Sequence, residues 1–285
     1  MAYQKFVPSV WAESINRELE KALVFAEDCN RQYEGNVQKM GDTVRILGVG
    51  QPTITTATFQ APAADSSLSR SSNITLAAPE EVADNDVVML INNISYYNFM
   101  VGDIDQKQAV PGVMDALTKE SAYGLADAMD QAIANEIKTN GTKLDTNATA
   151  VTKANILTYI DSAIQKLYEA NVPRSTELVL TVNPAFYMLL KQAYVDLDTN
   201  NSAMLENGRV GKYGNVTVKM SNNITTTGFV GISLRTKKAV AFANPLTHVE
   251  PYRPEIKFAD ALKGFVLYGT KIVRPNELVV LNCTL

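Results

Sequence analysis

Residues 111–141, PGVMDALTKESAYGLADAMDQAIANEIKTNG, carry the longest helical signal in the sequence. Pro111 and Gly112 open the segment, and Asn140 and Gly141 supply a C-terminal stop. Apolar and small residues recur at steps of three and four, which places on one helical face Met114, Leu117, Ser121, Leu125, Ala128, Ala132, Ile133 and Ile137. A helix over residues 112–139 would extend roughly 42 Å at about 1.5 Å per residue. A compact chain of 285 residues has a radius of gyration near ~19 Å, so a helix of this length favours a flat, extended subunit.

Before this helix the apolar period changes to two, which indicates strands. Residues 43–49, 86–91 and 95–101 are rich in β-branched and aromatic side chains, whereas residues 55–78 are dominated by Ala, Ser and Thr. The pattern predicts a long two-limbed β excursion whose tip cannot build a core of its own. An isolated two-stranded hairpin is marginally stable in water, so the excursion must lie on a surface. That surface belongs either to its own domain or to another copy of the chain.

The first segment, residues 9–30, is predicted to form an amphipathic helix. Its apolar face carries Trp11, Ile15, Leu19, Ala22, Leu23 and Ala26. The helix either packs on its own domain or forms an arm that lies on a neighbouring subunit, and the pattern does not decide between the two.

The sequence after the long helix predicts an α+β domain. Residues 143–152 form a polar connector, and Thr152 is expected to cap a helix that ends at residues 171–173. A buried strand over 177–182 follows, and Asn183 and Pro184 are typical of the start of another helix. Short strands are expected over 214–220, 228–233 and 238–242, and residues 262–281 are expected to pair back near the long helix.

Composition and charge exclude several classes of protein. The chain is 46% hydrophobic and 20% charged, which is too apolar for intrinsic disorder. Its 26 basic and 30 acidic residues give a net charge of −4, which disfavours general binding to nucleic acid. The N-terminus lacks an apolar signal region and no apolar run is long enough to span a bilayer, so no membrane association is expected.

The inventory of reactive side chains argues against an enzyme. His248 is the single histidine and is interpreted as structural, and two isolated cysteines cannot complete a zinc site with it. Asp103 and Asp105 could share one strand face and hold a divalent cation, but a solvated pair is favoured. Because nucleotide-binding and nucleophile-elbow motifs are also absent, we expect no catalytic residues, no metal and no cofactor.

Four motifs, taken in order, resemble the major capsid protein of tailed bacteriophages, which has the HK97-type fold. They are GDTVRI at 41–46, NFMVGDID at 98–105, NGRVGKYGNVTV at 207–218 and GFVLYGTKIVRP at 264–275. The resemblance implies an α+β capsid fold with five parts. These are an N-terminal arm (1–41), an extended β-hairpin or E-loop (42–105), a peripheral domain with the spine helix (106–150), an axial α+β domain (151–255) and C-terminal strands that return to the peripheral domain (256–285).

This resemblance implies a shell protein that assembles with itself. Copies would form hexamers and pentamers of an icosahedral virion head around double-stranded DNA, which they would not bind sequence-specifically. Synthesis would take place in the cytoplasm of a bacterial host, with a separate scaffolding protein and a portal as further partners. The arm and the E-loop are expected to contact neighbouring copies through Trp11, Ile15, Leu19, Phe59, Ala61, Leu68 and Arg70.

Two alternatives remain at the level of sequence. An encapsulin-like nanocompartment resembles the same fold but encloses a cargo enzyme. An enzyme with an α+β substrate domain is the third interpretation, and a soluble monomer with turnover would favour it.

The lysine pattern generates a prediction about covalent chemistry. Members of the family that cross-link use an E-loop lysine, but here no lysine lies between Lys39 and Lys107. We therefore expect assembled particles to run on denaturing gels as one band near 31 kDa. A ladder of covalent oligomers would contradict this expectation.

Overall fold

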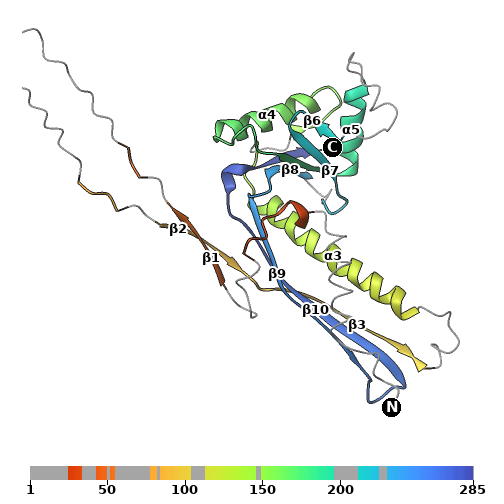
Figure 1. Cartoon of the computed structure of the whole chain (residues 1–285). Coiled ribbons are helices and arrows are strands. Elements are labelled where there is room, and N and C mark those ends of the chain that lie inside the picture. Colours follow the sequence, from red (N-terminus) through yellow and green to blue (C-terminus); the bar gives the residue numbers. More distant parts are fainter. Residues whose placement is uncertain are drawn as a thin grey trace, which may run out of the picture. The chain divides into compact units, whose positions relative to one another are not determined.

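The computed structural model describes residues 25–33, 43–49, 52–54, 78–81, 84–103, 113–145, 149–195, 211–224 and 230–284. The chain divides into two units, a main unit of residues 1–44 and 89–285 and a hairpin unit of residues 45–88. The main unit contains the long helix, a three-stranded sheet and a six-stranded sheet (Figure 1). Strands β1 (Thr43–Val49) and β2 (Asp84–Leu90) pair in a separate two-stranded sheet.

Helix α3 (Val113–Asn140) agrees with the predicted spine helix to within one residue at each end. Its buried face differs from the predicted stripe, since Leu117 is exposed while Ala122, Ala126 and Met129 are buried. Alanines occur all around this helix, so apolar spacing alone left its orientation undetermined. Burial follows instead from which side chains meet the two sheets.

The three-stranded sheet has the order β3-β10-β9, with all pairs antiparallel. Its strands are β3 (Asn93–Gly102), β9 (Val240–Tyr252) and β10 (Ala259–Ile272). The register places on the face packed into the core Tyr97, Phe99, Val249, Leu262, Val266 and Tyr268. Pro245 and Pro251 are tolerated in β9 because it is an edge strand.

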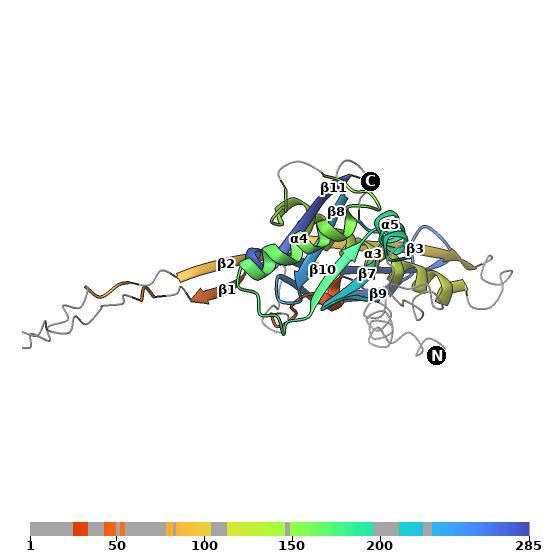
Figure 2. The same cartoon turned by 90° about the horizontal axis from the view of Figure 1, so that it is seen from above.

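The six-stranded sheet has the order β4-β11-β8-β5-β7-β6. Its strands are β4 (Thr149–Ala150), β5 (Leu178–Val182), β6 (Lys212–Tyr213), β7 (Val216–Met220), β8 (Val230–Thr236) and β11 (Leu278–Thr284). Helices α4 (Ile156–Glu169) and α5 (Pro184–Val195) lie on one side of this sheet, and α3 lies on the other (Figure 1). Figure 2 views the main unit from above, and α4 packs against β11 of the sheet.

Local signals around α4 and α5 had mixed outcomes. Asn183 Oδ1 accepts a hydrogen bond from the Phe186 amide at 2.8 Å, which confirms the predicted cap of α5. Thr152 does not cap α4, because a turn intervenes and the N-cap residue is Asn155. Asn155 Oδ1 instead accepts from the Thr152 amide at 2.7 Å. The helix therefore begins one turn later than the sequence indicates.

Two strands, β3 and β11, pair with strands outside the part of the five-part division to which each belongs. Strand β3, expected within the excursion of residues 42–105, pairs along its length with β10 in the main unit. Strand β10 returns beside the spine helix as expected, but β11 lies in the six-stranded sheet between β4 and β8. The side chains of β11 are buried from Leu278 to Cys283, which suits a central strand with both faces covered.

Gly269 of β10 lies next to Leu90, the last residue of β2. A β-carbon on Gly269 would lie 2.6 Å from the Leu90 carbonyl oxygen, which is a backbone atom and cannot rotate away. The register of β10 with β9 also shifts between Leu267 and Gly269. A glycine is therefore required for close approach of two backbones.

We expect Gly269→Ala to lower the free energy of unfolding by about 1–3 kcal/mol, because the added methyl group overpacks this contact. Thermal unfolding of the soluble subunit measures the effect. Gly124→Ala is the matched control, since nothing lies within 4 Å of its β-carbon position on α3. The control should raise stability by about 1 kcal/mol through helix propensity, and a loss of stability in both variants would contradict the explanation.

Candidate assembly surfaces

The residues singled out as candidate metal ligands or catalytic groups lie apart from one another. His248 is exposed on β9, with its ring centroid 5.7 Å from that of Phe265 on β10. Asp103 forms an ion pair with Arg253, whereas Asp105 lies outside the described residues. Among the residues that the structure describes, no group of three His, Cys, Asp or Glu side chains could hold a metal ion. None of the described helices is long and apolar enough to cross a membrane.

Residues 25–30, the root of the N-terminal segment, are fixed to the main unit by buried polar contacts. The segment contains a short 3-10 helix (η1, Ala26–Asp28), so the α-helix predicted over residues 9–30 does not extend to Asn30. The Phe25 amide donates to Asp130 Oδ1 of α3 at 2.9 Å. Asn30 donates through its amide to the Val240 carbonyl at 2.8 Å and accepts from the Phe242 amide at 3.1 Å. These tertiary partners replace the helical hydrogen bonds that the sequence pattern indicated.

Arg235 on β8 is the centre of this root and is 0% exposed. Its Nη1 atom donates to the Asp28 carbonyl at 2.6 Å, and its guanidinium lies 5.6 Å from the ring centroid of Phe25. The Asp28 carboxylate is itself buried and lies 2.7 Å from Lys219 Nζ and 3.8 Å from Lys237 Nζ. A buried charge of either sign is costly unless it is paired or hydrogen-bonded. The Arg235 guanidinium therefore depends on the Asp28 carbonyl, and the Asp28 carboxylate depends on the two lysines.

Burial and ion pairing in this root shift the pKa values of its ionisable side chains. Burial lowers the pKa of Lys219, but its hydrogen bonds and ion pairs with Asp28 and Glu27 together outweigh that effect, and the net pKa is raised. Burial raises the pKa of the Cys29 thiol, which donates to the Phe25 carbonyl at 3.1 Å. Burial also raises the pKa of Cys283 to about 12. Neither cysteine forms a disulfide and both thiols are buried, so neither is suited to act as a nucleophile.

The outer face of the three-stranded sheet, opposite its core face, is a candidate surface for another molecule. The register places on it Ile94, Tyr96, Asn98 and Met100 of β3, His248, Glu250 and Tyr252 of β9, and Ala261, Lys263 and Phe265 of β10. Tyr96 is 76% exposed, and Ile94 and Met100 are also exposed. Lys263 pairs with Glu250 at 2.9 Å and lies over the Tyr252 ring, so the polar groups on this face are partly neutralised.

The hairpin unit offers a second candidate surface. Thr53 and Glu80 flank the tip on its two sides. The Thr53 amide donates to Glu80 Oε2 and the Thr53 hydroxyl donates to Glu80 Oε1, each at 3.0 Å. Ile54 is exposed next to this contact. The two limbs thus pair beyond the ends of β1 and β2, as expected for a long two-limbed excursion.

The seven residues predicted to contact neighbours all lie outside the described residues, namely Trp11, Ile15, Leu19, Phe59, Ala61, Leu68 and Arg70. The outer sheet face was missed by sequence reasoning. Its signal was the alternation in residues 94–100, where large apolar or aromatic residues dominate both sets of alternate positions despite Ser95 and Asn98. Such a strand has no predominantly polar face to turn to solvent.

Comparisons with known proteins agree with this fold. A family model described as phage capsid protein matches residues 94–280, more than half of the chain.

The chain belongs to the phage capsid protein family. It is a major capsid protein, a structural component of the virion head shell, and the HK97-like fold predicted from its motifs is confirmed. The family match does not favour the encapsulin-like alternative.

Solved structures share the fold. A structure from Mycobacterium phage Che8 is similar with a TM-score of 0.76 and 29% identity, covering 90% of each chain. The capsid of cyanophage P-SCSP1u gives a TM-score of 0.73 at 16% identity, over 92% of this chain and 88% of that chain. The mature capsid of bacteriophage PhiM1 gives 0.66 at 18% identity, over 90% and 87%. No curated protein sequence matches the chain.

The root of the arm gives a prediction for the capsid subunit. We expect Arg235→Met to lower the free energy of unfolding by about 3 kcal/mol, because the buried Asp28 carbonyl loses its charged donor and the Phe25 carbonyl loses one of its donors. Thermal unfolding of the soluble subunit measures this loss.

Arg274→Met is the matched control, since Arg274 is an exposed arginine paired with Glu277 at 2.8 Å. The control should change stability by less than about 0.5 kcal/mol. Equal losses in the two variants would show that the buried root is not special.

Proposed function

We propose that this capsid protein assembles as hexamers and pentamers into a closed icosahedral shell around double-stranded DNA, with other copies of the same chain as its main partners. The observation that carries this proposal is the hairpin unit of residues 45–88, which pairs as a two-stranded sheet and is separate from the main unit. Two strands alone are marginally stable in water, so such a unit gains stability from a surface on another molecule.

The arm and the E-loop are the segments that we propose to reach neighbouring copies. We retain Trp11, Ile15 and Leu19 on the arm as proposed contacts. On the E-loop, the proposed contacts are Phe59, Ala61, Leu68 and Arg70. The buried contacts of residues 25–30 would give the arm a fixed point of departure, so that its direction is the same in every subunit of one kind.

The charge of the chain supports a shell that encloses DNA without holding it tightly. A net charge of −4 provides no general attraction to phosphate, and a shell that is filled and later emptied needs none. We propose that DNA is contained without sequence-specific binding. A separate scaffolding protein and a portal, and synthesis in the cytoplasm of a bacterial host, complete the proposal.

Removal of the E-loop tip tests the proposal. We expect a chain lacking residues 61–72 to fold with an unchanged unfolding temperature but to form no shells, because this Ala- and Ser-rich stretch is poor in the large apolar side chains that build a core. Negative-stain microscopy and sedimentation measure assembly, and circular dichroism measures folding.

The double variant Phe59→Ser and Leu68→Ser keeps the loop at full length and provides a milder form of the same test. It should reduce the yield of shells while leaving the subunit folded. Normal particles from the chain without its tip would mean that the E-loop is dispensable and would remove the main support for the proposed contacts.

A further inference from the structure

A proline lies on each limb of the hairpin unit just outside the paired strands. Pro52 follows the end of β1 at Val49, and Pro79 precedes the start of β2 at Asp84. A proline has no backbone N–H group and cannot donate to a strand ladder, so backbone pairing is interrupted on both limbs. Beside these prolines the limbs are joined through a side chain instead.

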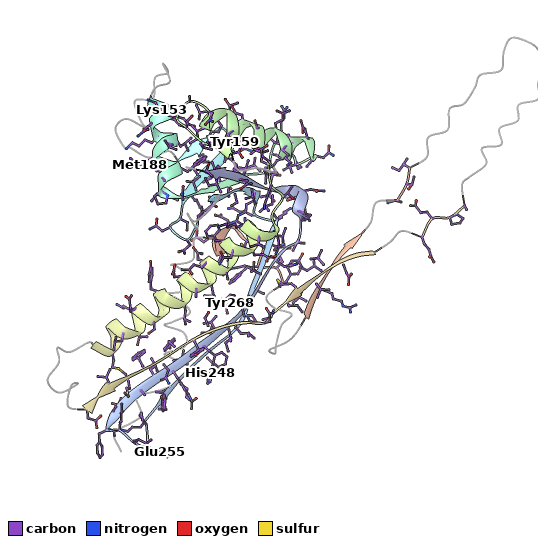
Figure 3. All side chains as sticks on the ribbon, turned by 180° about the vertical axis from the view of Figure 1, so that it is seen from behind. Lys153, Tyr159, Met188, His248, Glu255 and Tyr268 are labelled. Carbon is purple, nitrogen blue, oxygen red and sulfur yellow. The ribbon has the colours of Figure 1, made fainter. Side chains whose placement is uncertain are left out.

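The residue that follows each proline forms this contact. The Thr53 amide and the Thr53 hydroxyl donate to the two carboxylate oxygens of Glu80, each at 3.0 Å. Thr53 lies four residues after the end of β1 and Glu80 lies four residues before the start of β2, so the two residues stand equally far along the two limbs. Figure 3 draws the side chains of residues 52–54 and 78–81 as two short stretches beyond the ends of β1 and β2. We refer to the pair as the Thr53–Glu80 clasp.

The two hydrogen bonds of the clasp form a two-point contact. An ionised carboxylate accepts at both oxygens, and threonine supplies two donors that lie close together, its amide and its hydroxyl. Hydrogen bonds to an ionised acceptor are stronger than those between neutral groups. Two bonds between the same two residues also restrict the rotation of one limb against the other, which a single bond leaves free.

The contact is specific to one of two adjacent glutamates. Glu81 is exposed, like Glu80, but it forms no hydrogen bond or ion pair with any residue that the structure describes. Thr53 and Glu80 are 27 positions apart, and bringing together the ends of a segment of that length costs conformational entropy. When the clasp has already closed the base of the segment, less conformational freedom remains to be lost on binding.

We propose that the Thr53–Glu80 clasp preorganises the E-loop for assembly, by holding its two limbs together where residues 55–77 begin and end. This inference rests on the proposed role of the E-loop in reaching neighbouring copies, and it adds the pair of residues that prepares the loop for that role. A preorganised segment associates at a lower entropic cost than one whose limbs move apart. Shell formation is therefore faster and more complete when the clasp is closed.

Amide hydrogen exchange in the soluble subunit tests whether the clasp forms in solution. We expect Glu80→Ala, which removes both acceptors, to speed exchange at the Thr53 amide by about threefold to tenfold, since that amide loses its acceptor. Glu81→Ala is the matched control and should leave this rate unchanged. Both variants should keep the unfolding temperature of the unmodified chain, because both glutamates are exposed. Equal exchange rates in the two variants would overturn the clasp.

A graded series of variants links the clasp to assembly. Thr53→Val keeps the amide and the shape of the side chain but loses the hydroxyl, whereas Thr53→Ser keeps both donors. We expect the initial rate of shell formation, followed by light scattering, to fall about tenfold for Glu80→Ala, by a smaller factor for Thr53→Val and not at all for Thr53→Ser.

Glu80→Gln separates the charge of the clasp from its geometry. Glutamine keeps an oxygen that accepts from the Thr53 amide and an NH₂ group that can donate to the hydroxyl, but it is neutral. Its rate of shell formation should lie between those of Glu80→Ala and the unmodified chain. A side chain that only stabilised the fold would change the unfolding temperature and would not produce this order.

Each outcome bears on a separate claim. Faster exchange with an unchanged rate of assembly would overturn the proposed preorganisation, because the clasp would form without affecting the shell. A loss of assembly in Thr53→Ser as large as that in Glu80→Ala would also overturn it, because serine keeps both donors. If the unmodified chain forms no particles in the presence of its phage partners, the proposed assembly itself fails, while the exchange rates still show whether the clasp forms.

Discussion

Burial of one face of α3 against both sheets is the constraint on which the main unit depends. The helix packs along β3 and β10 of the three-stranded sheet and reaches β8 of the six-stranded sheet. Its last turn is so close to the larger sheet that a β-carbon on Gly231 would lie 3.0 Å from the Lys138 side chain. A single helix of 28 residues thus joins two sheets that share no hydrogen-bonded strand pair in the described structure. A continuous hydrophobic core in the main unit follows from this arrangement.

The two faces of the three-stranded sheet differ in burial. One face fills the space beside α3, where Tyr97 packs over Gly264 so closely that a β-carbon there would lie 2.6 Å from the ring. The other face leaves Ile94, Tyr96 and Met100 exposed, although Leu267 on the same face is buried. Large exposed apolar patches favour association, which is unwanted in a monomeric protein. A shell protein must associate with other subunits, so such a patch suits it.

Buried charge is used where the chain must change direction. The root of the arm passes between α3, β7 and β8, and Arg235, Asp28 and Asp130 replace the backbone partners that a helix or strand would have provided. Charged groups in this position are specific as well as stabilising, since only one path of the backbone satisfies them all. An apolar contact of the same area would fix the direction of the arm less well.

The sequence determined the elements, because their signals are local. The spine helix between Pro111 and Gly141, the strand over residues 43–49 and the Asn183 cap were each readable from spacing and residue type, and the order of four motifs identified the capsid fold. Tertiary structure decided which surfaces those elements cover. The buried face of α3 followed from the two sheets, since its alanines permit several orientations. The pairing of β3 with β10 and of β11 with β8 involves residues more than 40 positions apart, and a period of two fixes the alternation of faces without naming the partner strand. The exposed side chains on the outer face of the three-stranded sheet could be recognised only once those pairings were known.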